Sequence, residues 1–538
     1  MHPNPALVHA SGGHPFSYDT SQGGTTFRDP ENDAITYSVG LNQFYPGAGL
    51  TVSGPMISGT LEKSGDIDVY VNADDGHGGS TAHDTFHIVI DPNKPPTVVS
   101  PNLALITTAG AHVDYDLTKG GTVFEDADGD PLTYEVAIVT PPLGLSVDSA
   151  HHVIGSLDDV GMVSFEMTAR DEYGGSAVDR FTVAVPAPEP GKPTLPATSY
   201  VYDDAQLPLP PLFRFSRDQF GPFWDTTLLS GNEPTNAGAT LGRVLFYDKR
   251  LSITNTHACG SCHHQAHGFA SPEPFNTGVA GVPLKRNAMA LVNARYNLDN
   301  LYFSDRRVMT LENLVPMPIE EPSELGNFMP LVVAKLAATD FYPPLFEAAF
   351  GTPEITEERV RFAIAQFVRS LISYRTKFDA AYSYRGSSSA PDPATVLTAE
   401  ELWGSKLFEA APGAPCSFCH VSDVQEVDVP ANNGLDAVPT DPGVGGGRFR
   451  AASLRNIAVT GPYMHDGRFA TLREVIDHYD HGLVGSLTLS DLLRDPGFTR
   501  QPNVMGLSEE DKNALEAFLL TLTDDALLND PKFADPFL

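Results

Sequence analysis

The stretch His257-Ala258-Cys259-Gly260-Ser261-Cys262-His263 decides how the rest of the chain is interpreted, and Cys416-Ser417-Phe418-Cys419-His420 repeats its pattern. Cys-x-x-Cys-His is the attachment signature of a c-type haem, because two thiols at this spacing can form thioethers and the adjacent imidazole can bind the iron. The chain's 4 cysteines all lie in these motifs. The alternative is one four-cysteine zinc site, but it leaves both histidines unexplained. The sequence therefore predicts two covalently bound c-type haems.

Composition excludes several classes of function. The 538 residues suffice for three or four domains, and 41% of them are hydrophobic, which is enough to build real cores. A net charge of −34 argues against nucleic acid as a partner. No stretch approaches the roughly 18 to 20 apolar residues of a membrane span. Residues 1–195 carry more net negative charge per residue than the remainder, because they hold 26 acidic and only 7 basic residues, against 42 and 27 in the other 343.

Cysteine usage and the start of the chain bear on the compartment. No cysteine is left for a disulfide once two haems are attached. Because haem attachment to Cys-x-x-Cys-His normally occurs outside the cytoplasm, we expect a periplasmic or extracellular protein. The opening Met1-His2-Pro3-Asn4 has neither the charged nor the apolar region of a signal peptide, so we expect that the signal peptide is not part of this sequence.

The first third holds two copies of one pattern. Gly-Gly-Thr-Thr-Phe-Arg-Asp at 23–29 recurs 97 residues later as Gly-Gly-Thr-Val-Phe-Glu-Asp at 120–126. Short alternating apolar runs between Gly, Pro and Asp turns are typical of all-β sandwiches. We therefore predict two sandwiches, over 8–92 and 95–187, followed by a Pro-rich linker over 188–200. Each copy resembles the cadherin-like, immunoglobulin-type modules of bacterial surface and secreted proteins.

The acidic turn of the second copy has two interpretations. Asp126, Asp128 and Asp130 stand at alternate positions, and with Asp171 from a later loop they can supply oxygen ligands to Ca²⁺. The alternative is an Asp-rich turn whose carboxylates bond the local backbone. In either case the modules contain no catalytic constellation, so we expect them to position or tether the region that follows.

From about residue 200 the pattern changes to helices joined by long loops. A Gly-x-x-Leu-Phe element precedes each haem motif, at 242–246 and at 404–408. The region is therefore predicted to be mainly α-helical, with two cytochrome-c-like halves over 201–390 and 391–538.

The sequence predicts where two helices of this region begin. Thr356 is a predicted N-cap, because acidic residues and a periodic apolar face follow it. A last helix is predicted to begin near Ser508, with Asp511 as its capping partner. Both apolar faces are predicted to pack in a core.

Five motifs around the two haem signatures occur in a fixed order. They are Leu-Phe-Tyr-Asp-x-Arg-Leu-Ser (245–252), Arg-Asn-Ala (286–288), Pro-Ile-Glu-Glu-Pro-Ser-Glu-Leu-Gly (318–326), Leu-Arg-Asn-Ile-Ala-Val-Thr-Gly-Pro-Tyr-Met-His-Asp-Gly (454–467) and Ala-Thr-Leu-Arg-Glu-Val (470–475). Over about 236–525 the chain thereby resembles the bacterial di-haem cytochrome c peroxidase family, which includes the MauG enzymes.

The resemblance implies roles for individual residues. In that family the N-terminal haem reacts with peroxide and the C-terminal haem stores or relays electrons, so His263 would bind the active iron and His420 the second iron. Glu324 falls where the family has its distal acid–base glutamate, which takes a proton from H₂O₂ and returns it to the leaving oxygen. The family's interdomain calcium site corresponds to Asn287, Thr460 and Pro462.

The second iron's other ligand departs from the usual peroxidase pattern. Most peroxidases of the family have a Met at this position, whereas this chain, like MauG, has Tyr479. Tyrosinate is a hard anionic ligand that favours oxidised over ferrous iron. The alternative is a buried helical Tyr479 with Met464 or Met505 as the ligand.

Two further departures concern the active haem. The loop 277–282 lacks the distal His of typical peroxidases, so the active iron is expected to be open in the resting protein. A Trp normally lies between the haems, but the spacing places Phe303 there. Trp224 or Trp403 would have to substitute in space for rapid transfer between the haems.

These features favour an H₂O₂-dependent di-haem oxidoreductase that oxidises an external donor. With a cytochrome c or a cupredoxin as donor, the activity would be that of a cytochrome c peroxidase. With a Trp or Tyr side chain of a partner protein as donor, the enzyme would be MauG-like. The alternative is a non-catalytic di-haem electron-transfer cytochrome, which would need two six-coordinate irons and leaves Glu324 without a role.

Overall fold

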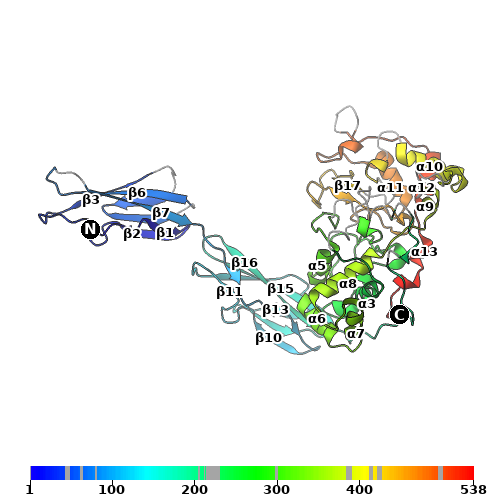
Figure 1. Ribbon diagram of the computed structural model, residues 1–538, viewed down its shortest axis with the longest axis horizontal. Helices are drawn as coiled ribbons and strands as arrows, with labels where there is room; N and C mark the ends of the chain where they lie inside the picture. Colours follow the sequence, from blue (N-terminus) through cyan, green and yellow to red (C-terminus); the bar gives the residue numbers. More distant parts are fainter. Residues whose placement is uncertain are drawn as a thin grey trace.

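The molecule is elongated, with two β modules that lie end to end and lead into a helical region carrying both haem motifs (Figure 1). The computed structural model describes residues 2–42, 49–60, 65–78, 82–203, 206–210, 213, 231–296, 301–382, 390–410, 416–420, 427–494 and 501–538. This architecture confirms the predicted fold class of two immunoglobulin-type sandwiches followed by a mainly α-helical region. None of the described helices combines the length and apolar character that crossing a bilayer requires.

The first module consists of two facing sheets. One has the strand order β1-β7-β6-β3 and the other β2-β5-β4. Their bounds are β1 Leu7–Ser11, β2 Pro15–Asp19, β3 Thr36–Leu41, β4 Leu50–Ser53, β5 Met56–Thr60, β6 Gly65–Asp74 and β7 Ala82–Asp91. Along β6, Ile67, Val69 and Val71 are buried at alternate positions, as a strand with one face in the core requires.

The second module repeats this arrangement. Its main sheet has the order β12-β15-β16-β9, its second sheet β10-β14-β13, and β11 pairs with β8. The bounds are β8 Thr97–Val98, β9 Leu105–Ile106, β10 His112–Asp116, β11 Phe124–Glu125, β12 Thr133–Ile138, β13 Leu145–Val147, β14 His152–Ser156, β15 Gly161–Arg170 and β16 Ser176–Val185. On β15, Val163, Phe165 and Met167 face the module's own core, yet Met162 on the opposite face is also buried.

Each of the two predicted haem-bearing halves contains its own pair of packed helices. In the first half α3 (Asn236–Tyr247) packs on α8 (Glu357–Arg369), and in the second α10 (Ala399–Ala410) packs on α12 (Glu509–Leu520). A Cβ on the glycine of either Gly-x-x-Leu-Phe element would lie 1.9 Å from a carbonyl oxygen of the partner helix, that of Ala363 or Ala514. The repeated glycine therefore permits close contact of the two helix backbones.

Shorter elements complete the helical region. They are α4 Leu311–Leu314, α5 Pro316–Glu320, α6 Met329–Ala337, α7 Tyr342–Phe350, α9 Lys377–Tyr382, α11 Leu472–Asp477, α13 Asp525–Leu528, and the strand pair β17 Val427–Ala431 and β18 Phe449–Ala451. Both predicted N-caps are confirmed, since Thr356 accepts from the Arg359 N–H and Ser508 forms a reciprocal capping box with Asp511.

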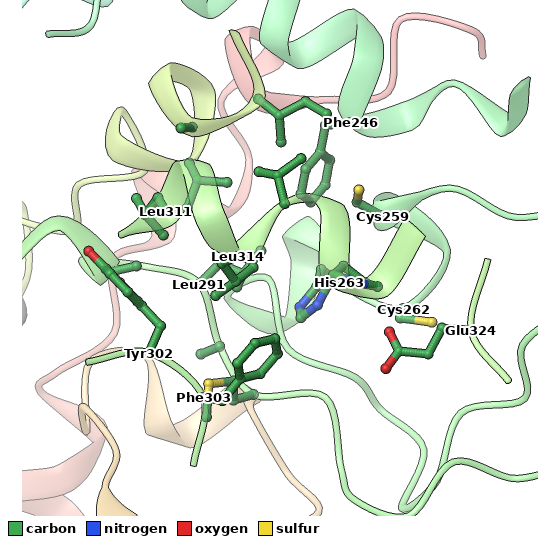
Figure 2. Close-up of a pocket in the computed structure, with 18 of the residues that line it drawn as sticks. Phe246, Cys259, Cys262, His263, Leu291, Tyr302, Phe303, Leu311, Leu314 and Glu324 are labelled. Atoms are coloured by element: carbon green, nitrogen blue, oxygen red, sulfur yellow. The ribbon is translucent and has the colours of Figure 1, made fainter. Parts of the chain in front are cut away.

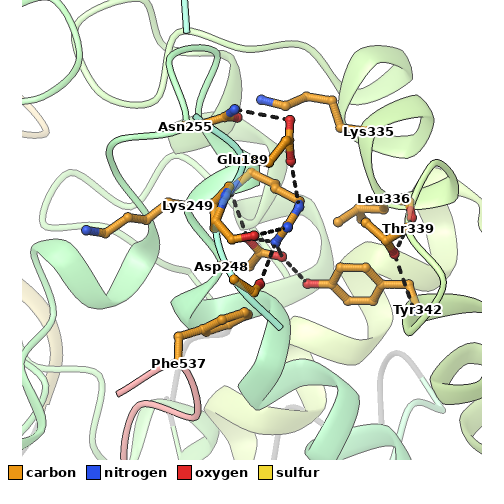
Figure 3. Close-up of polar contacts among 12 residues, drawn as sticks. Glu189, Asp248, Lys249, Asn255, Lys335, Leu336, Thr339, Tyr342 and Phe537 are labelled. Carbon is orange, nitrogen blue, oxygen red and sulfur yellow. Dashed lines mark hydrogen bonds and ion pairs between the residues drawn. The ribbon is translucent and has the colours of Figure 1, made fainter. Parts of the chain in front are cut away.

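The Pro-rich segment predicted as a linker lies against the helical region (Figure 3). The buried Arg250 guanidinium contacts the Glu189 carboxylate, with Nε–Oε2 at 2.9 Å, and also the carbonyl of Pro190. The Asp248 carboxylate accepts a hydrogen bond from the Arg250 guanidinium and another, of 2.6 Å, from the Tyr342 hydroxyl. The Pro-rich segment that joins the second module to the helical region is thus held against that region by an ion pair and hydrogen bonds.

Candidate haem sites

The first Cys-x-x-Cys-His motif lies on the wall of a large cavity (Figure 2). The cavity contains about 1230 Å³ of empty space, its open mouth included. Most of its lining is apolar, with Phe246, Leu291, Leu311 and Leu314 among the contributing side chains. A cavity that is mostly apolar and edged by two thiols and an imidazole fits a haem attached through thioethers.

His263 is oriented as an iron ligand. Its Nδ1–H donates to the Phe269 carbonyl at 2.9 Å, which leaves Nε2 as the atom that can bind a metal. Burial lowers the pKa of His263, which favours the neutral form of the ring that ligation requires. Cys259 and Cys262 line the same cavity. The structure therefore brings the predicted thioether and iron-binding residues of the first haem together.

Glu324 also lines this cavity, although it comes from a loop some sixty residues further along the chain (Figure 2). Its backbone carbonyl accepts from the Val279 N–H at 2.9 Å. Burial, followed by the nearby Glu321 carboxylate, raises the pKa of Glu324, while Arg307 acts in the opposite sense. A carboxyl group beside Cys262, with a raised pKa and in a largely apolar cavity, is suited to exchanging protons with a bound ligand.

Histidines near the cavity are engaged by other groups. His264 Nε2 lies 3.1 Å from the Ser261 carbonyl, and His267 Nδ1 lies 2.9 Å from the Val459 carbonyl. His257 lines the cavity, a role that the motif pattern did not predict, and its Nδ1 lies 2.8 Å from Thr256 Oγ1. Sequence reasoning also missed the contribution of the second half to the wall, through Arg450, Ala452 and Ser453.

Phe303, which the spacing places at the position of the family's bridging Trp, lines the cavity (Figure 2). The Arg307 guanidinium lies over its ring, 4.1 Å from the centroid. Trp403 instead lies on α10, is 48% exposed, and donates through Nε1 to Asp511 at 2.9 Å. It does not line this cavity, and Trp224 lies outside the described residues.

The second motif lies in a short helical turn, Cys416–Phe418, followed by His420. Tyr479 belongs to a π-helical turn, His478–Gly482, a rare geometry that is frequent at functional sites. Burial raises the pKa of Tyr479 to about 12, and the nearby thiols of Cys419 and Cys416 add to this shift. Tyr479 thus lies near both attachment cysteines of the second motif.

Two of the three candidate ligands of the second iron, Tyr479 and Met464, approach the same amide group. Asn433 Nδ2 lies 3.5 Å from Tyr479 Oη and 3.2 Å from Met464 Sδ. Met505 is buried, and its N–H donates to the Asp480 carbonyl at 2.9 Å. Ligation by Tyr479 stays a prediction, and Met464 is the methionine that approaches the same Asn433 amide.

The predicted interdomain calcium residues lie on neighbouring segments. The Asn287 N–H donates to the His465 carbonyl at 2.8 Å, which places Asn287 beside the loop that carries Thr460 and Pro462. Asn287 Nδ2 donates to the Glu273 carbonyl at 2.8 Å, so Oδ1 is the atom available to a cation. An amide oxygen with backbone carbonyls is a donor set that suits Ca²⁺.

The acidic turn of the second module forms a cluster. Carboxylate oxygens of Asp126, Asp130 and Asp171 lie within 4.8 Å of one another, and His14 of the first module with Asp128 and Asp130 forms an overlapping group. Burial, with the Asp126 carboxylate, raises the pKa of Asp130, while His14 acts in the opposite sense. Asp126 Oδ1 accepts from two backbone N–H groups of the turn. Both interpretations of this turn stay open.

Comparison with known proteins follows the same division of the chain. Residues 236–388 match the family model described as di-haem cytochrome c peroxidase, and residues 95–186 match that of a putative Ig domain. The methylamine utilization protein MauG of Methylorubrum extorquens is 33% identical over 301 residues, which cover 54% of this chain and 79% of that protein.

Two further relatives cover the same region. The cytochrome c551 peroxidase of Nitrosomonas europaea is 30% identical over 320 residues, 57% of this chain and 84% of that protein. The crystal structure of a MauG-like protein associated with microbial copper homeostasis is 31% identical with a TM-score of 0.50, and the match covers 57% of this chain and 95% of that chain. None of these matches takes in the whole of the present chain.

Proposed function

The chain belongs to the di-haem cytochrome c peroxidase/MauG family, which implies two c-type haems, and from this premise we propose that it reduces H₂O₂ at an open N-terminal haem and oxidises an external donor. The overall reaction consumes one H₂O₂, two electrons and two protons and releases two waters. The observation that carries the proposal is the shared cavity of His263, its two cysteines and Glu324.

The bound haem would supply an iron that takes the peroxide as a ligand and exchanges electrons with it. Within the chain, His263 would hold that iron through Nε2, because its Nδ1–H is committed to Phe269. Glu324 would accept a proton from the bound peroxide oxygen and return it to the leaving oxygen, so that water departs. The apolar side chains of the wall exclude water from this exchange.

The second haem would be held by Cys416 and Cys419, with His420 and Tyr479 as iron ligands, and would hold or pass on oxidising equivalents. The external donor is either a small redox protein, such as a cytochrome c or a cupredoxin, or a Trp or Tyr side chain of a partner protein. The open first site and Tyr479 favour the aromatic side chain, whereas Phe303 at the sequence position of the bridging Trp disfavours it. A periplasmic location is proposed because haem attachment to Cys-x-x-Cys-His takes place there.

Addition of one equivalent of H₂O₂ to the as-isolated diferric protein tests this function. We expect an immediate and long-lived change in the visible and near-infrared absorption, because the N-terminal site is open without prior reduction. A reaction that starts only after one haem is reduced would contradict the open-site proposal. No reaction in either state, with both haems six-coordinate and low-spin, would favour the electron-transfer cytochrome instead.

We also propose that Ca²⁺ binds Asn287 Oδ1 together with the carbonyls of Thr460 and Pro462. Removal of Ca²⁺ by a chelator is expected to lower the unfolding temperature of the haem-bearing region, because a ligand at 100 times its Kd stabilises the folded state by about 2.7 kcal/mol, or roughly 5–10 °C. Differential scanning calorimetry measures the shift. Asn287→Ala should abolish it, and retention of the full shift in that variant would contradict this site.

Asp130→Asn is the matched control for the other candidate cation site. It should leave the calcium response of the haem-bearing region unchanged. Any calcium-dependent shift in unfolding temperature that this substitution removes would come from Ca²⁺ bound to the β modules.

A further inference from the structure

The second β module contacts the haem-bearing region through an apolar face. Met162 on β15 and Ala184 on β16 are paired across the two strands and are both 0% exposed. Their side chains point away from the module's own core and pack with Ile253 and Val279 of the haem-bearing region. This face is therefore covered by another domain, which accounts for the uninterrupted burial of residues 162–165 on β15.

Met162 reaches the loop that carries Glu324. Gly326, two residues beyond Glu324, has φ +58°, the left-handed region that favours glycine. A Cβ at Gly326 would lie 2.6 Å from Met162 Sδ and 2.9 Å from Val279 Cγ2. The thioether of Met162 therefore occupies the space that the missing side chain of Gly326 leaves.

The residues that Met162 contacts also hold the backbone around Glu324. The Val279 N–H donates to the Glu324 carbonyl at 2.9 Å, and the Ile253 N–H donates to the Leu325 carbonyl at 3.0 Å. The two residues packed against Met162 thus hold the carbonyls of two successive peptide bonds, Glu324–Leu325 and Leu325–Gly326. A shift of this apolar contact would be passed to the Glu324 backbone through two hydrogen bonds.

Hydrogen bonds also join the end of the second module to the segment that carries Ile253. The Ala187 N–H, just beyond β16, donates to the Thr254 carbonyl at 2.8 Å. In return, Asn255 Nδ2 donates to the Ala187 carbonyl at 3.1 Å. Thr254 and Asn255 directly follow Ile253 in the chain, so the end of β16 and the Met162 contact hold one short segment, 253–255.

We propose that the second β module is a structural part of the peroxide site, in which Met162 is a positioning residue that holds the Glu324 loop through Val279, Ile253 and Gly326. The proposal deepens the function proposed above and rests on the role given there to Glu324. It assigns the module a task beyond tethering.

Met162→Ala in the full-length protein with both haems tests the proposal. Hydrogen exchange followed by mass spectrometry should show at least roughly tenfold faster exchange of the Val279 and Ile253 amides, because the methionine that packs against them is gone. The rate constant of the diferric protein with H₂O₂ should fall roughly tenfold or more, since a displacement of about 1 Å at a reacting group can cost about 10²-fold. Met162→Leu, which restores most of the volume, should recover both quantities.

Met167→Ala is the matched control, because Met167 lies on the same strand, is equally buried and packs in the module's own core. It should weaken the module without changing the two amides or the peroxide rate. Equal effects of the two alanine variants, or no effect of Met162→Ala on the amides, would overturn the proposal. Should the wild type itself fail to react with H₂O₂, the proposed function fails, whereas amide exchange still decides whether Met162 holds the loop.

Discussion

Replacement of Glu324 by Gln is expected to lower the rate constant of the diferric protein with H₂O₂ by about 10²–10⁴-fold, the range that a positioned general acid–base contributes. Gln keeps the shape of the side chain but cannot accept and return a proton. The absorption spectrum of the resting protein should stay unchanged, because the proposed role of Glu324 is proton exchange and not iron ligation. Stopped-flow absorption with excess H₂O₂ measures the rate constant.

Glu320→Gln is the control for this substitution, since Glu320 is an exposed carboxylate only four residues away. It should react at the wild-type rate. The pH profile gives a second readout, because burial raises the pKa of Glu324 and only the ionised form can accept a proton. The wild-type rate should therefore increase with pH as this carboxyl ionises, and the increase should be absent in Glu324→Gln. A variant that keeps the wild-type rate and profile would remove Glu324 from the mechanism.

Replacement of Tyr479 by Met is expected to raise the reduction potential of the second haem by on the order of 100 mV or more, because a neutral thioether favours ferrous iron whereas tyrosinate favours the oxidised state. The diferric variant should also lose the long-lived response to one equivalent of H₂O₂, since the second site would no longer hold oxidising equivalents. Spectroelectrochemical titration measures the potential. The N-terminal haem should keep its wild-type potential.

Met464→Leu is the matched test of the competing ligand, because Met464 Sδ and Tyr479 Oη both approach the Asn433 amide. If Tyr479 binds the iron, Met464→Leu should leave the spectrum and potential of the second haem essentially unchanged. A large change in Met464→Leu, together with none in Tyr479→Met, would assign the iron to Met464. Met505→Leu examines the remaining methionine in the same way.

If Met162 holds the Glu324 loop as proposed, the β modules of this chain differ from a simple tether. The first module lies far from the haem-bearing region, whereas the second contacts it (Figure 1). Substitutions in the two modules should then have different consequences. Substitutions on the face of β15 that carries Met162 should alter the rate constant with H₂O₂. Substitutions in the first module should leave that rate constant unchanged.

The parts of this protein that the sequence could predict depend on neighbouring residues. A Cys-x-x-Cys-His segment carries its chemistry within five residues, so both haem motifs were recognisable before any fold was known. The caps at Thr356 and Ser508 are equally local, because a side-chain oxygen bonds an N–H three residues later. The duplicated Gly-x-x-Leu-Phe element predicted two similar halves, and the contact of paired helix backbones at each glycine explains that element.

Only the tertiary structure decided which distant segments form the peroxide site. Arg450 and Ser453 of the second half enter a cavity built mainly by the first, and Phe303 rather than Trp403 lies in its wall. Met162 meets Gly326 across more than 160 residues of chain, and neither residue has a motif that points to the other. Periodicity and motifs report bonding within a segment, whereas packing between domains depends on the complementary shapes of surfaces that exist only once each domain has folded.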